Sequence, residues 1–147
     1  MPPSLTEIFS DLVRLETELW DVLEGALRAK HGLLLSWYEP MQVIARTPNC
    51  RVHDIATALA ITVGGTSKLV DRIEESGWCE RRRNPLDSRS SVLALTARGR
   101  RLLTAAERSA SEELERVIGT AVSSHELTQF STMLQQLRAS VRAARAP

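Results

Sequence analysis

Residues 79–99 read CERRRNPLDSRSSVLALTARG, and this stretch decides the fold. The segments 79–84 and 90–95 have the length of short strands, and the residues 85–88 between them favour turns. The first segment carries three consecutive arginines at positions 81–83. The stretch therefore predicts a β-hairpin with an arginine-rich arm.

A helix-turn-helix is predicted directly before this hairpin. Residues 54–60 have the apolar spacing of a short helix, residues 60–62 make a tight connection, and Thr62 is a suitable cap for a helix that extends to Ser76. The inward face of the second helix consists of Thr66, Leu69, Val70 and Ile73, and its outward face of Val63, Gly64, Ser67, Lys68 and Asp71. The outward face is free to enter a DNA major groove. An ordinary helical hairpin has the same periodicity, but the basic hairpin that follows favours a winged helix that binds DNA.

Longer helices are predicted on both sides of this region. Capping-box spacings begin at Ser4, Ser36 and Ser123, Thr96 is a further N-cap, and Gly32 is a suitable helix end. The expected helices cover residues 4–32, 36–46, 96–119 and the chain from 123 onward, with a very short strand over 50–52. The predicted fold class is therefore mainly α-helical with a small β-hairpin wing.

The net charge of +1 conceals an uneven distribution. Residues 1–49 carry 4 basic and 7 acidic side chains, residues 50–103 carry 10 and 6, and residues 104–147 carry 5 of each. The near-neutral total is unlike that of a general nucleic-acid coat protein. The basic middle third nevertheless predicts one positive surface, the alternative being an ordinary solvated face.

Composition and motifs exclude several classes of protein. With 43% hydrophobic and 25% charged residues the chain has globular composition, and no apolar run reaches the roughly 18 residues of a membrane helix. No secretory signal is visible, and Cys50 and Cys79 form no CxxC pair, which fits a reducing cytoplasm. We therefore expect a cytoplasmic protein. HExxH, GxSxG, Walker and Rossmann spacings are absent from the sequence, so we expect neither an enzyme nor a cofactor.

Four segments of the middle third resemble the winged-helix core of the MarR (multiple antibiotic resistance regulator) family. They are VHDIATALAI (52–61), TSKLVDRIE (66–74), GWCER (77–81) and NPLDSRSSVLALTARG (84–99). The last is the most specific, because Asp87 and Arg89 stand two apart before a strand that ends in Leu95 and Thr96, and Gly99 follows. The resemblance implies a winged helix-turn-helix transcription regulator.

The resemblance also implies roles for individual residues. Arg89 corresponds to the wing arginine that enters a minor groove, and Asp87 to the acid that orients the wing. Asp71 stands where some relatives place an acid that pairs with the wing arginine when DNA is absent. The residues that we expect to contact DNA are Thr62, Val63, Gly64, Ser67, Lys68, Arg72, Arg83, Asp87, Ser88 and Arg89.

Two consecutive glycines depart from the family pattern. Gly64 and Gly65 stand where relatives often have a larger polar residue followed by alanine. Two glycines cost a helix roughly 2 kcal/mol relative to alanine, and they remove a side chain that could contact a base. Base recognition is therefore expected to depend on the rest of this helix, on the wing and on DNA shape.

The outer helices carry more apolar surface than a winged helix can cover. In the family such helices interleave two subunits, so we expect a homodimer that reads inverted half-sites; the alternative is a monomer in which they pack on their own chain. The expected organisation is one domain, 1–147, in which residues 1–35 and 104–147 form the dimerisation region and residues 36–103 the DNA-binding region.

The resemblance implies a small-molecule effector as well, because such regulators commonly bind small aromatic or phenolic acids. Arginine suits a carboxylate and tryptophan an aromatic ring. The candidate ligand-binding residues are Arg14, Trp20, Trp37, Tyr38 and Arg46, although the tryptophans are equally suited to a core or dimer interface.

The two cysteines are less suited to a switch. Cys50 and Cys79 fit buried apolar positions better than a redox switch, and the grouping of Cys50, His53 and Asp54 is too weak for a metal site.

Taken together, these features predict a homodimeric repressor that a small ligand releases from a palindromic operator. The alternative is a winged helix that is switched by cysteine oxidation or that binds another protein.

Overall fold

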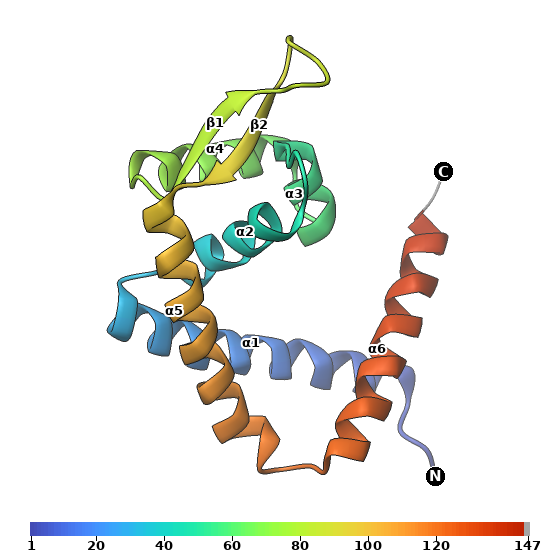
Figure 1. The fold of residues 1–147 in the computed structure, drawn as a ribbon. Coiled ribbons are helices and arrows are strands. Elements are labelled where there is room, and N and C mark those ends of the chain that lie inside the picture. Colours follow the sequence, from blue (N-terminus) through green and yellow to red (C-terminus); the bar gives the residue numbers. More distant parts are fainter. Residues whose placement is uncertain (146–147) are drawn as a thin grey trace. The chain divides into compact units, whose positions relative to one another are not determined.

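The computed structural model describes residues 1–145. This part of the chain consists of helices and a two-stranded antiparallel sheet (Figure 1). The elements are α1 (Leu5–His31), α2 (Leu35–Arg46), α3 (Val52–Leu59), α4 (Val63–Glu75), β1 (Cys79–Arg83), β2 (Ser91–Leu95), α5 (Ala97–Leu114), a π-helical turn (Glu115–Gly119) and α6 (Ser124–Arg145). The predicted fold class, mainly α-helical with a hairpin wing, is confirmed.

The chain forms two compact units. The first covers Met1–Ala110 and holds α1 to α4, the hairpin and most of α5. The second begins at Ser111 and holds the end of α5, the π-helical turn and α6. The long helix expected to reach residue 119 is α-helical only to Leu114, and the chain continues to Gly119 as the π-helical turn. The functional division at residues 35 and 103 stays a prediction.

The core of the first unit forms where the helices meet the hairpin. It is built from apolar side chains contributed by α1 to α5, by both strands of the hairpin and by the connections between them. On α4 the buried residues are Thr66, Val70 and Ile73, and Leu69 packs against the core, which confirms the predicted inward face. The buried side chains of this core include Leu27, Leu33, Met41, Ile44, Ile55, Leu93, Leu95, Leu103 and Ala106.

The hairpin forms close to the predicted positions. Cys79 pairs with Leu95 and Arg83 with Ser91, so the turn covers residues 84–90. The expected strand over residues 50–52 is wrong. The carbonyl of Cys50 accepts one hydrogen bond of 2.7 Å from the amide of Leu93, and α3 already begins at Val52. A single bond to the sheet holds this connection without making it a strand.

Most of the predicted caps are present. The hydroxyls of Ser4, Thr62, Thr96 and Ser123 each accept a hydrogen bond from a backbone amide three residues later. The cap expected at Ser36 is wrong, because α2 begins one residue earlier, at Leu35. The Glu24 carboxylate of α1 accepts a 2.6 Å hydrogen bond from the Leu35 amide, so a side chain from another helix satisfies this end.

The base of the hairpin is tied to the start of α5. Gly77 ends α4 with a φ of +77°, a conformation that favours glycine. The hydroxyl of Thr96 donates to the Gly77 carbonyl at 2.7 Å, and the Thr96 amide donates to the Trp78 carbonyl at 3.1 Å. A Cβ atom at Gly99 would lie 1.9 Å from that same Trp78 oxygen, so only glycine permits this approach. The wing and α5 are thus held together at this point.

Candidate DNA-binding surface

Helix α4 is fixed at its N-terminus by local hydrogen bonds. The Thr62 hydroxyl accepts from the Gly65 amide at 3.2 Å, and the Thr66 hydroxyl donates to the Thr62 carbonyl at 2.7 Å. Thr66 is fully buried, so this end of the helix is anchored against the core. The remaining amides of the first turn have the orientation that suits a phosphate oxygen.

The other face of α4 is open to solvent. Val63, Gly64, Lys68 and Arg72 are exposed and Ser67 is half-buried. Apart from Lys68 and Arg72 these residues are small, which lets the backbone of α4 approach a base edge or phosphate closely. The structure therefore brings the predicted contacts of this helix together on one exposed face.

The wing loop is held by a buried asparagine. The Asn84 side chain donates to the Ser90 hydroxyl at 2.8 Å and accepts from the Leu86 amide at 2.9 Å. The Asp87 carboxylate accepts from the Arg89 amide at 3.0 Å, a hydrogen bond that orders the turn. Figure 1 shows the loop projecting past the strands, away from α1. Ser88 and Arg89 lie in this loop, and both side chains are exposed.

An ion-pair cluster joins the wing to α4. The Arg81 guanidinium on β1 donates to Asp71 at 2.6 Å and also to Glu74, and the Arg81 amide donates to Glu74 at 2.9 Å. Partial burial opposes the charge of Arg81, but hydrogen bonds to Asp71 and Glu74 raise its pKa above the ordinary value. Because the three side chains come from two elements, the cluster fixes the wing relative to α4.

This cluster corrects one expectation and adds two residues. Asp71 pairs with Arg81, so it does not form the predicted pair with the wing arginine Arg89. Arg81 and Asn84 position the surface, and neither was predicted as a site residue. The Asn-Pro pair at 84–85 is a turn signal that could have identified Asn84, whereas the partners of Arg81 depend on the tertiary structure. Arg83 is exposed at the end of β1.

The predicted ligand residues are dispersed through the first unit. Arg14 is exposed and pairs with Asp11 at 3.4 Å, whereas Arg46 pairs with Glu107 of α5 at 3.3 Å. Trp37 packs edge-on against Trp78 with ring centroids 5.5 Å apart. The buried Tyr38 hydroxyl accepts from Gln42 at 3.0 Å, and Trp20 lies at the surface. Gln42 also donates to Glu107 at 3.2 Å, so Tyr38, Gln42, Arg46 and Glu107 form one polar network between α2 and α5.

Both cysteines are buried free thiols. Burial, with a smaller effect from neighbouring carboxylates, raises the pKa of Cys50 and that of Cys79 to about 11. Within residues 1–145 there is no cluster of histidine, cysteine and acidic side chains that could hold a metal ion. The same residues contain no helix that is long and apolar enough to cross a membrane.

Comparison with known proteins gives one family. Residues 38–91 match the model of the MarR family. The chain is 28% identical over 108 residues to an HTH-type transcriptional regulator, BilQ, from Clostridium symbiosum, and the match covers 74% of each chain.

Solved structures of other proteins share the fold. Sco3205 of Streptomyces coelicolor, a MarR family regulator in complex with DNA, is 20% identical with a TM-score of 0.82 and covers 95% of this chain and 91% of its own. CouR of Rhodococcus jostii, bound to p-coumaroyl-CoA, is 22% identical with a TM-score of 0.81 and covers 92% and 95%. The likeness over nearly the whole of each chain confirms the winged-helix fold.

Proposed function

This chain belongs to the MarR family of DNA-binding transcription regulators, and we propose that it is a homodimeric repressor of a palindromic operator. Its family and its curated relatives are regulators, so it is not an enzyme. The main support for this proposal is that the two elements expected to contact DNA, α4 and the wing, are connected to each other. The exposed face of α4 and the wing with Arg89 are fixed to each other through Arg81.

The two elements suit different parts of a DNA duplex. Helix α4 presents its N-terminal amides and Thr62 to phosphate oxygens, and Ser67 and Lys68 to base edges or phosphates in the major groove. Arg89 at the wing tip suits a narrow minor groove, where A·T-rich sequence attracts arginine. Arg72, Arg83 and Ser88 supply further contacts around these two points.

The homodimer is proposed from apolar side chains left exposed on both outer helices. On α1 these include Leu5, Ile8, Phe9 and Val13, and on α6 Phe130, Met133, Leu137 and Val141. An exposed apolar face of this kind is typical of a protein interface. A two-fold dimer would place two winged helices on half-sites about one helical turn apart, or a multiple of it.

The proposed function includes release from DNA by a small ligand. CouR, which has a similar fold, is bound to p-coumaroyl-CoA, an acidic aromatic ligand, and this supports an effector of that kind. The candidate contacts stay Arg14, Trp20, Trp37, Tyr38 and Arg46, and an acidic ligand at Arg46 would have to replace Glu107 as its partner.

Selection of genomic fragments by the purified protein tests the proposed function. We expect the recovered fragments to share an inverted repeat whose half-sites lie about one helical turn apart. Recovery of fragments with no common sequence would contradict sequence-specific binding. Recovery of a single unrepeated half-site would contradict the dimeric repressor. A thermal-shift screen of aromatic acids tests the effector, and the absence of any stabilising compound would count against it.

A further inference from the structure

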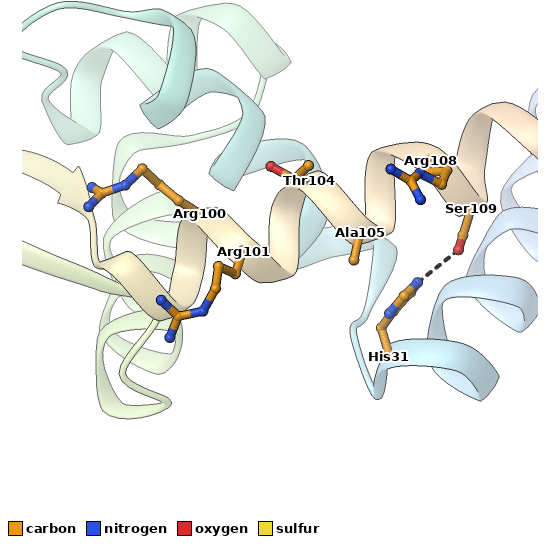
Figure 2. Close-up of a pocket in the computed structure, with 7 residues that line it drawn as sticks. All are labelled: His31, Arg100, Arg101, Thr104, Ala105, Arg108 and Ser109. Atoms are coloured by element: carbon orange, nitrogen blue, oxygen red, sulfur yellow. Dashed lines mark hydrogen bonds between the residues drawn. The ribbon is translucent and has the colours of Figure 1, made fainter.

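A hollow lies along the N-terminal half of α5, beside the end of α1. Its volume is about 500 Å³. All of its lining residues come from α5 except His31, at the end of α1, as Figure 2 shows. The lining residues are His31, Arg100, Arg101, Thr104, Ala105, Arg108 and Ser109. None of the candidate effector residues named above is among them.

The charge of this hollow is uncompensated. Three arginines line it, and no acidic side chain does. Elsewhere in the first unit Arg46, Arg81 and Arg82 each pair with a carboxylate. Arg101 and Arg108 make no ion pair within residues 1–145. Their guanidinium groups are therefore available to a ligand of opposite charge.

The shape of the hollow depends on small and fixed side chains. Figure 2 shows Ala105 on the helix between Arg101 and Ser109, with His31 beside Ser109. The His31 ring and the buried Ser109 hydroxyl share a hydrogen bond of 2.8 Å, which holds the ring at one end of the hollow. A larger side chain at position 105 would fill the space between the two ends.

Arg100 links the hollow to the wing. Its guanidinium donates to the carbonyl of Leu95, the last residue of β2, at 2.6 Å. The wall that Arg100 forms is therefore attached to the same strand that supports the wing loop. A ligand that bound the Arg100 guanidinium would compete with this backbone bond.

We propose that this hollow is a binding site for a small anion with more than one negative charge, such as a diphosphate group. Guanidinium groups bind phosphate and carboxylate oxygens in pairs of parallel hydrogen bonds. Arg101 and Arg108 are two helical turns apart, about 10 Å along the axis, and their long side chains can reach toward each other. Two charged groups on one ligand can thus be held at once, with Thr104 as a further donor.

Calorimetric titration of the DNA-free protein with inorganic pyrophosphate, at constant ionic strength, tests the site. We expect about one pyrophosphate per chain. The double variant Arg101→Ala, Arg108→Ala should bind at least about tenfold more weakly, as two contacts are lost. Arg138→Ala removes an exposed charge of α6 outside the hollow, and it should bind as the wild type does.

Two further variants keep every arginine in place. Ala105→Leu fills the hollow and Thr104→Glu adds a negative charge to it, and both are good helix formers at exposed positions. Each should weaken pyrophosphate binding at least about tenfold without lowering the thermal midpoint of unfolding. These variants test the site itself, even if the double arginine variant folds poorly.

Three results would overturn the proposal. The first is wild-type binding no tighter than that of the double variant. The second is an equal loss in Arg138→Ala, which would indicate general charge attraction. The third is that the wild type does not bind pyrophosphate while the double variant binds a DNA duplex more weakly than the wild type. That result would indicate that these arginines contact DNA phosphates. Because the titration contains no DNA, its failure is distinguishable from failure of the operator proposal.

Discussion

Burial governs the chemistry of the two thiols. Cys50 and Cys79 are almost completely buried, and burial raises the pKa of each to about 11 from an ordinary value of 9.0. Since the thiolate is the nucleophile, both residues are poorly reactive at neutral pH. This is the physical reason for preferring ligand control to the cysteine-oxidation alternative.

Alkylation by iodoacetamide at pH 7.5 measures this directly. The native protein should react about a hundredfold more slowly than the same protein in denaturant, because each pKa unit lowers the thiolate fraction about tenfold. The denatured sample is the control for total thiol. Equal rates in the two samples would contradict the burial of these thiols and restore the redox alternative.

Glu39 provides a pH-dependent test of packing on α2. Burial raises the pKa of this carboxyl above its ordinary value of 4.5, and the negative charge of Glu16 raises it further by a smaller amount. The folded state therefore binds the proton more tightly than the unfolded state. Stability contributed by the protonated form is lost as pH rises through the folded pKa.

Glu39→Gln should therefore raise the thermal midpoint of unfolding at pH 7.5, and the difference from wild type should shrink toward pH 4. Differential scanning calorimetry at both pH values gives the measurement. Glu16→Gln removes only the charge repulsion, so its effect should have the same sign and be smaller. Identical wild-type and Glu39→Gln midpoints at pH 7.5 would refute this account of Glu39.

At the scale of elements, α4 begins with two glycines in different surroundings. A Cβ atom at Gly64 would meet nothing within 4 Å, whereas one at Gly65 would lie 3.0 Å from the Thr62 hydroxyl that caps the helix. The first glycine is therefore free to gain a side chain, and the second is restricted by the cap.

Gly64→Ala should increase the free energy of unfolding by about 0.5–1 kcal/mol, since alanine restricts the unfolded chain and fits a helix. Gly65→Ala should gain clearly less, because it displaces a cap worth about 1 kcal/mol. Urea unfolding of both variants compares them under one condition. A larger gain for Gly65→Ala would show that the Thr62 cap does not restrict this position.

The caps also show which local features the sequence predicts. Thr62, Thr96 and Ser123 bond to amides three residues away, so short-range spacing is sufficient to identify them. The predicted start of α2 is wrong because its partner, Glu24, is 11 residues away on another helix. For the same reason, the spacing of residues does not reveal that Arg81 binds Asp71 and Glu74.

At the scale of the whole molecule, the winged helix is predictable from the sequence and the hollow on α5 is not. The turn residues around Asp87, together with the cap at Thr62, are local signals that indicate the DNA-binding surface. The hollow depends on which face of α5 remains uncovered and on the approach of His31 from α1. Neither follows from periodicity along α5.

The proposed dimer predicts a specific response of the second unit to added charge. Phe130 and Leu137 are 43% and 47% exposed on α6. Replacing both by glutamate should convert a dimer to a monomer in sedimentation velocity, because charges at an apolar interface are left without partners. Gln135→Glu adds a charge at an exposed polar position of the same helix and should leave the dimer intact. A dimeric double variant would exclude this face of α6 from the interface.

Helix α4 and the wing are proposed to bind DNA together. The most direct test is a mobility-shift titration of a selected operator fragment with wild type, Arg89→Ala and Lys68→Ala over a range of salt concentrations. Arg138→Ala is the matched loss of charge. Arg89→Ala should weaken binding by about 1–3 kcal/mol and leave the oligomeric state unchanged. Lys68→Ala should reduce the salt dependence by about one phosphate contact. Operator affinity and salt dependence equal to wild type in both variants would contradict the claim.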